Sequence, residues 1–281
     1  MTLNSAIDVR SKCKHFRILV IGRANAGKTT LLKKVCRSVE DPEIWSPSGE
    51  KVRRATPSFP GQCGSVCADR RLRGRRIRRR GIHDIENQLI FKSNPQFVFH
   101  DSRGFESGSV DEVDNVKTFM ANRAASYELS EQLHAIWYCM PTDTNRPSLK
   151  ADEDFFGTDM TGNGKACSCF HSFITDLHTT VPLIAVFTKY DGLVIEAESQ
   201  LVAEGRDEKE AEDEAPNRAR AILATNFREP LERAKFSPSE HVVLADMDQE
   251  SSDCKELIEK TANALTDDAL RLLFVSVQQN N

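Results

Sequence analysis

A glycine-rich segment near the N-terminus carries the residue types that hold phosphate. The segment Gly22-Arg-Ala-Asn-Ala-Gly27-Lys28-Thr29 matches the pattern G-x-x-x-x-G-K-[ST]. Its glycines let the backbone wrap a phosphate, while its N–H groups and the helix that follows supply a positive field. Lys28 would bridge the β and γ phosphates, and Thr29 would offer its hydroxyl to Mg²⁺. The nucleotide contacts predicted here are Gly22, Arg23, Ala24, Asn25, Ala26, Gly27, Lys28, Thr29 and Thr30.

A second segment places an aspartate three residues before a glycine. Phe97-Val-Phe-His-Asp101 has the apolar pattern of a strand, and Ser-Arg-Gly104 follows it. Ligands of α/β sheets bind at the carboxyl ends of strands, so Asp101 is predicted to hold Mg²⁺ opposite Thr29. Gly104 lacks a side chain, and its N–H can therefore approach the γ phosphate and move when that phosphate leaves. Lys28 and Gly104 are the two predicted catalytic residues.

A third segment, Thr188-Lys-Tyr-Asp191, follows the apolar run 181–187. The carboxylate of Asp191 could accept hydrogen bonds from N1 and the 2-amino group of guanine, whereas adenine has an acceptor at N1 and no 2-amino group. A site built on such bonds rejects a ligand that lacks them by about 10⁴ to 10⁵. Lys189 would lay its stem against the base and brace the phosphate loop, and Thr188 would orient that lysine. GTP and GDP are therefore the predicted ligands.

These segments need a sheet whose strand ends meet at one edge. Asn94-Pro95 joins two apolar runs so closely that they must pair antiparallel. Pro216 is expected to interrupt the charged helix that starts near Leu193, and the acids at 204–214 are expected to form its solvated face. Strands are predicted at 16–21, 85–91, 96–101, 134–140, 181–187 and 241–245, and helices at 29–37, 110–133, 170–177, 193 onward and 253–277.

The alternation of strands and helices predicts a three-layer α/β domain with a mostly parallel sheet. Phe99 and Trp137 lie inside predicted strands and are expected in the core. His100 and His134 lie at strand ends, where we expect hydrogen-bonded structural roles rather than catalysis.

The composition restricts the function classes. The 281 residues hold 42 acids and 38 bases, a formal net charge of −4, so the chain as a whole is not built to coat nucleic acid. The longest apolar run, 181–187, is far shorter than the roughly 20 residues that span a bilayer, so no transmembrane segment is expected. The N-terminus has no apolar signal segment, and eight cysteines then indicate reduced thiols in a cytoplasmic protein.

Two cysteine groups could suggest zinc. They are Cys63 with Cys67, and Cys167 with Cys169 and His171. Neither spacing is that of a standard zinc knuckle, so no zinc is expected.

The three segments together resemble the translation-factor-related GTPases, the superclass of Ras-like, Era-like and septin-like G domains. The resemblance covers roughly residues 16–250, and the strand pair before Asp101 is similar to the antiparallel second strand of that superclass. The runs Gly81-Ile-His-Asp-Ile-Glu-Asn, His100-Asp-Ser-Arg-Gly-Phe-Glu-Ser-Gly and Thr188-Lys-Tyr-Asp-Gly look like a group of fungal G-domain proteins near the Era-like and immunity-associated GTPases. The resemblance implies the fold of a P-loop NTPase G domain.

The chain departs from this superclass at two places. Leu-Ala245-Asp-Met stands where the base-binding loop would read Ser-Ala-Lys, so only Ala245 carries over as a guanine contact. Phe105 stands where Ras-like enzymes have a water-orienting glutamine. We therefore expect slow intrinsic hydrolysis that needs an activating protein partner or a homodimer.

The segment between the phosphate loop and the strand pair is unusual. Thr56 is the candidate for the switch threonine that closes on Mg²⁺. Positions 70–80 hold eight arginines in eleven residues. A solvated loop is favoured over binding of RNA, lipid or a phosphoprotein, because no aromatic residues or RNA-module signature accompany the arginines. Retained noncoding sequence is a further interpretation of 53–80.

The prediction from sequence is a Mg²⁺-dependent molecular switch that hydrolyses GTP slowly to GDP and phosphate. Two alternatives remain: a nucleotide-binding scaffold with little or no turnover, and an ATP-using P-loop protein. The expected organisation is a tail at 1–15, a G domain at 16–250 with the arginine-rich insertion near 53–80, and a helical extension at 251–281.

Overall fold

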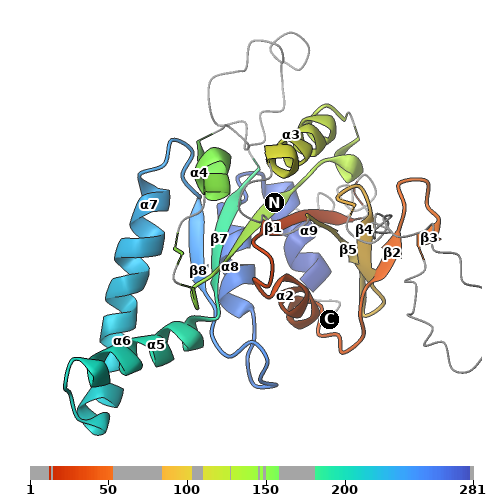
Figure 1. Ribbon diagram of the computed structural model, residues 1–281. Helices are drawn as coiled ribbons and strands as arrows, with labels where there is room; N and C mark the ends of the chain where they lie inside the picture. The colour runs from red at the N-terminus through yellow and green to blue at the C-terminus, as the bar shows by residue number, and fades with distance from the viewer. Residues whose placement is uncertain are drawn as a thin grey trace, which may run out of the picture.

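The fold is built on one eight-stranded sheet (Figure 1). The computed structural model describes residues 13, 15–52, 84–102, 110–126, 128–144, 146–147, 150–157 and 181–278. The strand order is β3-β2-β4-β5-β1-β6-β7-β8. The strands are β1 (Phe16–Gly22), β2 (Glu43–Trp45), β3 (Lys51–Val52), β4 (Gln88–Phe91), β5 (Asn94–Asp101), β6 (Ala135–Pro141), β7 (Leu183–Thr188) and β8 (Glu240–Val243).

The centre of the sheet is parallel and one side is antiparallel. β1 pairs in parallel with β5 and β6, and β6–β7 and β7–β8 continue the parallel part. β4 pairs antiparallel with both β5 and β2, and β2 pairs antiparallel with β3. The predicted α/β class, the mostly parallel sheet and the antiparallel second strand are thus confirmed. The short strands β2 and β3 are not among the strands that the sequence predicts.

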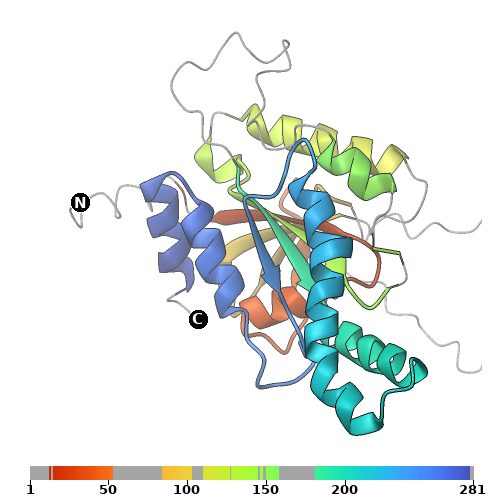
Figure 2. The same cartoon turned by 90° about the vertical axis from the view of Figure 1, so that its left-hand side faces the viewer.

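Helices cover both faces of the sheet, as the two views in Figures 1 and 2 show. They are α2 (Lys28–Val35), α3 (Val110–Ala124), α4 (Lys150–Phe156), α5 (Tyr190–Ala203), α6 (Glu208–Ile222), α7 (Glu229–Glu232), α8 (Lys255–Ala264) and α9 (Asp268–Gln278), with a 3-10 turn at Leu129–Glu131 and a π-helical segment at Leu223–Arg228 between α6 and α7.

The sheet has a hydrophobic cluster on each face, and alternate residues of β1 belong to one or the other. Phe16, Ile18 and Val20 belong to the cluster formed with α2, α8 and α9, while Leu19 and Ile21 belong to the cluster formed with α3 to α7. Every residue of β1 is buried, as expected for a central parallel strand with helices on both faces. The three-layer arrangement follows from this two-sided burial.

The C-terminal helix α9 packs against the sheet. The ring of Phe274 lies 4.7 Å from the ring of Phe16 and 5.8 Å from that of Phe97 (centroid distances). The side chain of Asn94 donates to the backbone oxygen of Val277, which ties the start of β5 to the end of α9. The last helix is therefore part of the core beside β1 and β5.

Three predicted helices end earlier or divide. The segment predicted as 110–133 is helical only to Ala124, and the segment predicted as 253–277 is divided between α8 and α9. The charged helix breaks at Gly205, whose φ of 97° suits glycine, and not at Pro216, which lies inside α6. Pro216 is exposed there, and so is Glu212, the residue whose carbonyl would accept from an N–H at position 216.

Phe99 and Trp137 are buried in the core as predicted. The structural roles expected for the two histidines are also confirmed. Arg17 donates to Nε2 of His100 across 2.8 Å, while the backbone N–H of Arg17 donates to Nδ1 of His134. Burial lowers the pKa of His100 to about 3 and that of His134 to about 4, so both rings are neutral at pH 7.

Candidate functional site

The phosphate-loop pattern lies between the end of β1 and the start of α2, where the sequence predicts it. Gly22 has a φ of 138°, and a Cβ built on it would lie 2.0 Å from the backbone oxygen of Cys139 in β6. Gly27 has a φ of 72° and precedes the first residue of α2. Only glycine fits the first position, because the backbone of β6 occupies the space of a side chain.

Lys28 is folded back over the loop that precedes it. Its ammonium donates to the backbone oxygens of Arg23, at 3.0 Å, and Gly22, at 3.3 Å. Thr29 and Thr30 follow in the exposed first turn of α2. This arrangement gathers a cation, a hydroxyl and a helix N-terminus at one place, which is the set of groups that holds an anion.

The side chain of Arg23 points away from the loop. Its guanidinium donates to Asp152 of α4 across 2.6 Å and to the backbone oxygens of Arg146 and Pro147. The hydroxyl of Tyr138 donates to the other oxygen of Asp152. Both side chains of the ion pair are at most 7% exposed. Because the guanidinium is bound to these groups, the predicted contact of Arg23 with the nucleotide could come only from its backbone.

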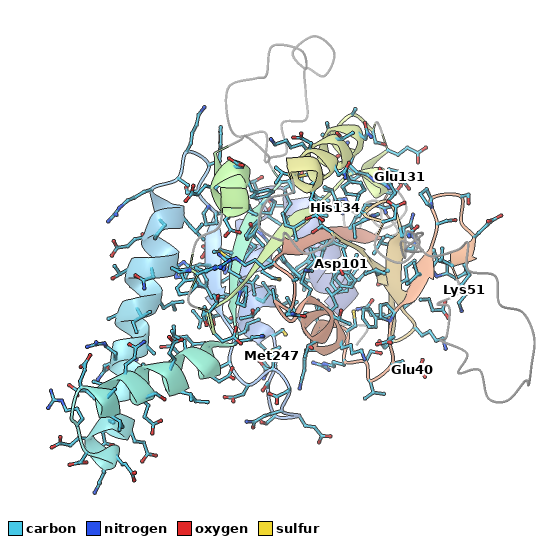
Figure 3. The ribbon with its side chains drawn as sticks, in the orientation of Figure 1. Glu40, Lys51, Asp101, Glu131, His134 and Met247 are labelled. Carbon is cyan, nitrogen blue, oxygen red and sulfur yellow. The ribbon has the colours of Figure 1, made fainter. Side chains whose placement is uncertain are left out.

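Asp101 ends β5 beside Val20 of β1, at the same edge of the sheet as the loop (Figure 3). Its Oδ1 is buried and has no hydrogen-bond partner among the described residues. Burial raises the pKa of this carboxyl to about 6, and the positive charge of Lys28 opposes that rise. A buried carboxylate oxygen without a partner is a suitable Mg²⁺ ligand or a ligand of its water shell.

Thr188 connects the third segment to the phosphate loop. Its hydroxyl donates to the backbone oxygen of Ala26 across 3.0 Å. Thr188 and Ala26 are both buried. The threonine therefore braces the loop from the end of β7, a role that the sequence predicts for Lys189.

Lys189 directly precedes α5, and Asp191 lies in the first turn of that helix. Lys189 has a left-handed backbone, with a φ of 58°, and its ammonium pairs with Asp143 at 2.9 Å. Oδ1 of Asp191 accepts from the backbone N–H of Asp246 across 2.9 Å, which holds this carboxylate beside the loop after β8. Ala245 lies in that loop, directly before Asp246. The structure thus brings the predicted base-recognition residues together.

Several predicted residues lie outside the described part of the chain. They are Gly104, Phe105, Thr56, the arginine-rich stretch, the helix at 170–177, and the cysteines and histidine at 63, 67, 167, 169 and 171. Among the residues that are described, no group of three or more histidines, cysteines or acids could hold a metal ion. The two predicted Mg²⁺ ligands, Asp101 and Thr29, both lie in the described part of the chain.

Sequence reasoning missed Thr142 and Asp143, and it gave no role to Gly192. Thr142 and Asp143 follow β6, and Gly192 stands directly after Asp191. A Cβ on Gly192 would lie 2.8 Å from the Cβ of Asp143. The only signal available in the sequence was the position of Thr142 and Asp143 at the end of a buried strand, which is where ligands of α/β sheets gather.

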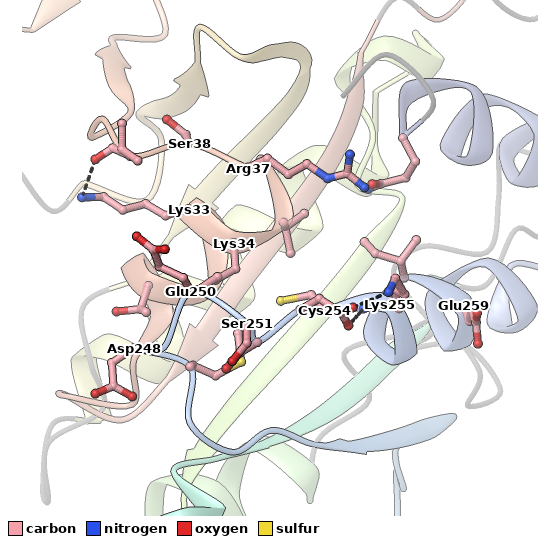
Figure 4. A pocket seen from close by; sticks show the side chains of 18 of the residues that line it. Lys33, Lys34, Arg37, Ser38, Asp248, Glu250, Ser251, Cys254, Lys255 and Glu259 are labelled. Atoms are coloured by element: carbon pink, nitrogen blue, oxygen red, sulfur yellow. Dashed lines mark hydrogen bonds and ion pairs between the residues drawn. The ribbon is translucent and has the colours of Figure 1, made fainter.

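A cavity of about 850 Å³ lies beside this site (Figure 4). Lys33, Lys34 and Arg37 line it from α2 and the turn that follows, while Asp248 and Glu250 line it from the loop after β8. Among the predicted contacts, only Thr30 lines it. The cavity is therefore adjacent to the candidate site rather than part of it.

None of the described helices is long and apolar enough to cross a membrane.

Comparison with known proteins finds similar solved structures. No family model matches the chain, and no curated protein matches it. The chain resembles a GDP-bound mutant of the G domain of FeoB from S. thermophilus, with 14% sequence identity and a TM-score of 0.38. The match covers 89% of this chain and 61% of that one, which is less than two thirds of its length.

Proposed function

We propose that the chain binds GTP and GDP with Mg²⁺, hydrolyses GTP slowly to GDP and phosphate, and acts as a molecular switch. The observation that carries this proposal is the hydrogen bond between Thr188 and Ala26. It joins a segment suited to guanine to a loop suited to phosphate. An ATP-binding loop has no need of Thr-Lys-x-Asp at this position.

The phosphate end of the ligand is assigned to Lys28 and the loop backbone. The ammonium of Lys28 now bonds to two carbonyl oxygens of its own loop and can exchange them for β- and γ-phosphate oxygens. Backbone N–H groups of the loop and of the first turn of α2 face the same anion. The two glycines let this backbone come close to the ligand.

Thr29 and Asp101 are the residues that would hold Mg²⁺. The unpartnered, buried oxygen of Asp101 fits a cation, and with its pKa at about 6 the carboxyl is ionised at pH 7. Mg²⁺ bound there would neutralise charge on the phosphate oxygens during transfer.

Asp191 is assigned to the guanine base. The N–H of Asp246 orients one carboxylate oxygen through its hydrogen bond. Each carboxylate oxygen has two lone pairs, so the group retains the capacity to accept from N1 and the 2-amino group. Lys189 would cover the plane of the base, and Ala245 would contact its edge.

Hydrolysis would use water as the nucleophile. Catalysis then consists mainly of positioning and charge neutralisation by Lys28, with Gly104 contacting the γ phosphate. Phe105 cannot orient water by hydrogen bonds, so turnover by the isolated chain is slow and an activating partner or a homodimer accelerates it. The GTP-bound and GDP-bound forms would be distinguished by an effector protein.

Nucleotide binding is tested by titrating the full chain with fluorescent GDP in Mg²⁺ and competing with GTP and ATP. GTP should compete and ATP should not. Lys28→Ala should abolish binding of both guanine nucleotides. Asp191→Asn should lose GDP and gain xanthosine diphosphate, because an amide donates to the 2-oxo group that replaces the 2-amino group. Competition by ATP would instead support the ATP-using alternative.

Turnover is tested by phosphate release from GTP in a binding-competent sample. Rates well below about 1 s⁻¹ are expected for the chain alone, since intrinsic rates of related chemistry are far below those with a partner. Binding without any phosphate release would support the nucleotide-binding scaffold. Folded protein that binds no guanine nucleotide would contradict the proposal.

A further inference from the structure

The turn after β6 holds the base-recognition segment in place. Pro141, the last residue of β6, pairs with Thr188, the last residue of β7. The next residue, Thr142, is fully buried. Its N–H donates to the oxygen of Thr188 at 2.9 Å, and its hydroxyl lies 3.1 Å from the oxygens of both Thr188 and Lys189. Thr142 thus fixes the backbone on which Lys189 stands.

That backbone has a conformation which needs support. Lys189 has a φ of 58°, a left-handed conformation that L-residues with side chains adopt rarely. Such residues persist where their surroundings determine the conformation, and they cluster at ligand sites. Here the support consists of Thr142 on one side and the N–H of Gly192, which donates to the oxygen of Lys189 at 3.1 Å, on the other.

Asp143 fixes the side chain of the same lysine. Its Oδ2 lies 2.9 Å from Nζ of Lys189, and the two side chains are 36% and 39% exposed. Gly192 makes room for Asp143, because a Cβ on that glycine would lie 2.8 Å from the Cβ of the aspartate. The backbone and the ammonium of Lys189 are therefore both held by consecutive residues of one turn.

We propose that Thr142 and Asp143 form a clamp that positions Lys189 for the guanine base. This inference rests on the proposed function, because the base is the group that Lys189 would cover. A free lysine stem has several rotatable bonds, and ordering it on binding costs conformational entropy. The clamp orders the stem before the ligand arrives, so Asp143 is a positioning residue and does not itself touch the nucleotide.

The test is a double-mutant cycle on the affinity of the full chain for GDP. Asp143→Ala removes the ion pair, and Lys189→Met keeps the apolar stem without the charge. The single change at Asp143 should weaken GDP binding roughly two- to five-fold, the range for a partly exposed pair. The double variant should bind GDP as Lys189→Met does, because the aspartate acts only through the lysine.

Two further comparisons separate positioning from general stability. Thr142→Val removes the hydroxyl at nearly constant volume, and Thr142→Ser keeps it. GDP binding should be weakened by the first and retained by the second. Glu232→Gln, which removes a surface ion pair of 2.6 Å with Arg228, is the matched control and should leave GDP affinity unchanged. Unfolding midpoints of Asp143→Ala and Glu232→Gln should both lie close to that of the wild type, because each variant loses one partly exposed ion pair worth at most about 1 kcal/mol.

Three results would overturn the inference. The first is wild-type affinity for GDP in Asp143→Ala. The second is a double variant whose loss is the product of the two single losses. The third is a wild-type chain that binds no guanine nucleotide. This result contradicts the proposed function itself. It differs from the first two because it is seen in the wild type, before any variant is made.

Discussion

The guanidinium of Arg23 and the carboxylate of Asp152 form a buried ion pair, with a nitrogen–oxygen distance of 2.6 Å. Arg23 belongs to the phosphate loop, and Asp152 belongs to α4. The backbone oxygen of Arg23 also accepts a hydrogen bond from the ammonium of Lys28. One residue therefore anchors the loop to a helix through its side chain and contacts the predicted catalytic lysine through its backbone.

Removing one partner of this pair should destabilise the fold. Arg23→Met leaves Asp152 charged and buried, and we expect a loss of about 3–5 kcal/mol in the free energy of unfolding. Chemical denaturation measures it. Arg233→Met, which breaks an exposed pair with Glu229 on one helix turn, is the control and should cost at most about 0.5 kcal/mol. Equal losses for the two variants would contradict the burial argument.

The brace between Thr188 and Ala26 should matter for both stability and binding. Thr188→Val leaves the buried oxygen of Ala26 without this donor and should lower the free energy of unfolding by about 1–3 kcal/mol. Because the loop loses its support, GDP affinity should fall as well. Thr188→Ser keeps the hydroxyl and should retain most of the stability and most of the GDP affinity. If the serine variant loses as much GDP affinity as the valine variant, the hydrogen bond is not the cause.

Gly22 should tolerate no side chain. Gly22→Ala places a methyl group 2.0 Å from the backbone oxygen of Cys139, so we expect the variant to unfold or to lose nucleotide binding. Gly49→Ala is the matched control, because Gly49 also has a positive φ, of 79°, with no atom within 4 Å of the new methyl group. The control should cost only about 1–3 kcal/mol of backbone strain. Circular dichroism melts and GDP titrations compare the two.

Asp101 should make the stability of the ligand-free chain depend on pH. Its pKa is raised by burial from 3.8 to about 6, so between pH 4 and 6 the folded state binds more protons than the unfolded state. The free energy of unfolding should therefore increase as the pH falls through 6 towards 4, by about 2–3 kcal/mol from this group. Asp101→Asn, which never ionises, should lack this contribution.

The measurement is denaturation of wild type and Asp101→Asn between pH 7.5 and 4.5 without nucleotide. At pH 7.5 the asparagine variant should be the more stable one, because it does not bury a charge. Parallel pH curves for the two proteins would contradict the assignment. In Mg²⁺ and GDP the order of the two proteins should change, since the charged form of Asp101 is the one that would hold the cation.

Local patterns were sufficient to predict the position of the site. A seven-residue buried strand, β1, ends at a glycine that has a φ of 138°, and the helix begins at Lys28. The runs that became β5 and β7 end in Asp101 and Thr188. Because parallel strands present their carboxyl ends at one edge, these motifs had to converge. The helix boundaries were less predictable, since Gly205 rather than Pro216 interrupts the charged segment.

The sequence by itself determined the fold class, the phosphate-loop pattern and the residues suited to guanine, because each depends on neighbours within a few positions. Only the tertiary structure decided which groups hold those residues. Thr188 and Ala26 are 162 positions apart, Arg23 and Asp152 are 129 apart, and Lys189 and Asp143 are 46 apart. Hydrogen-bond partners at such separations are set by strand order and by the direction of side chains at the sheet edge. No local periodicity encodes that information.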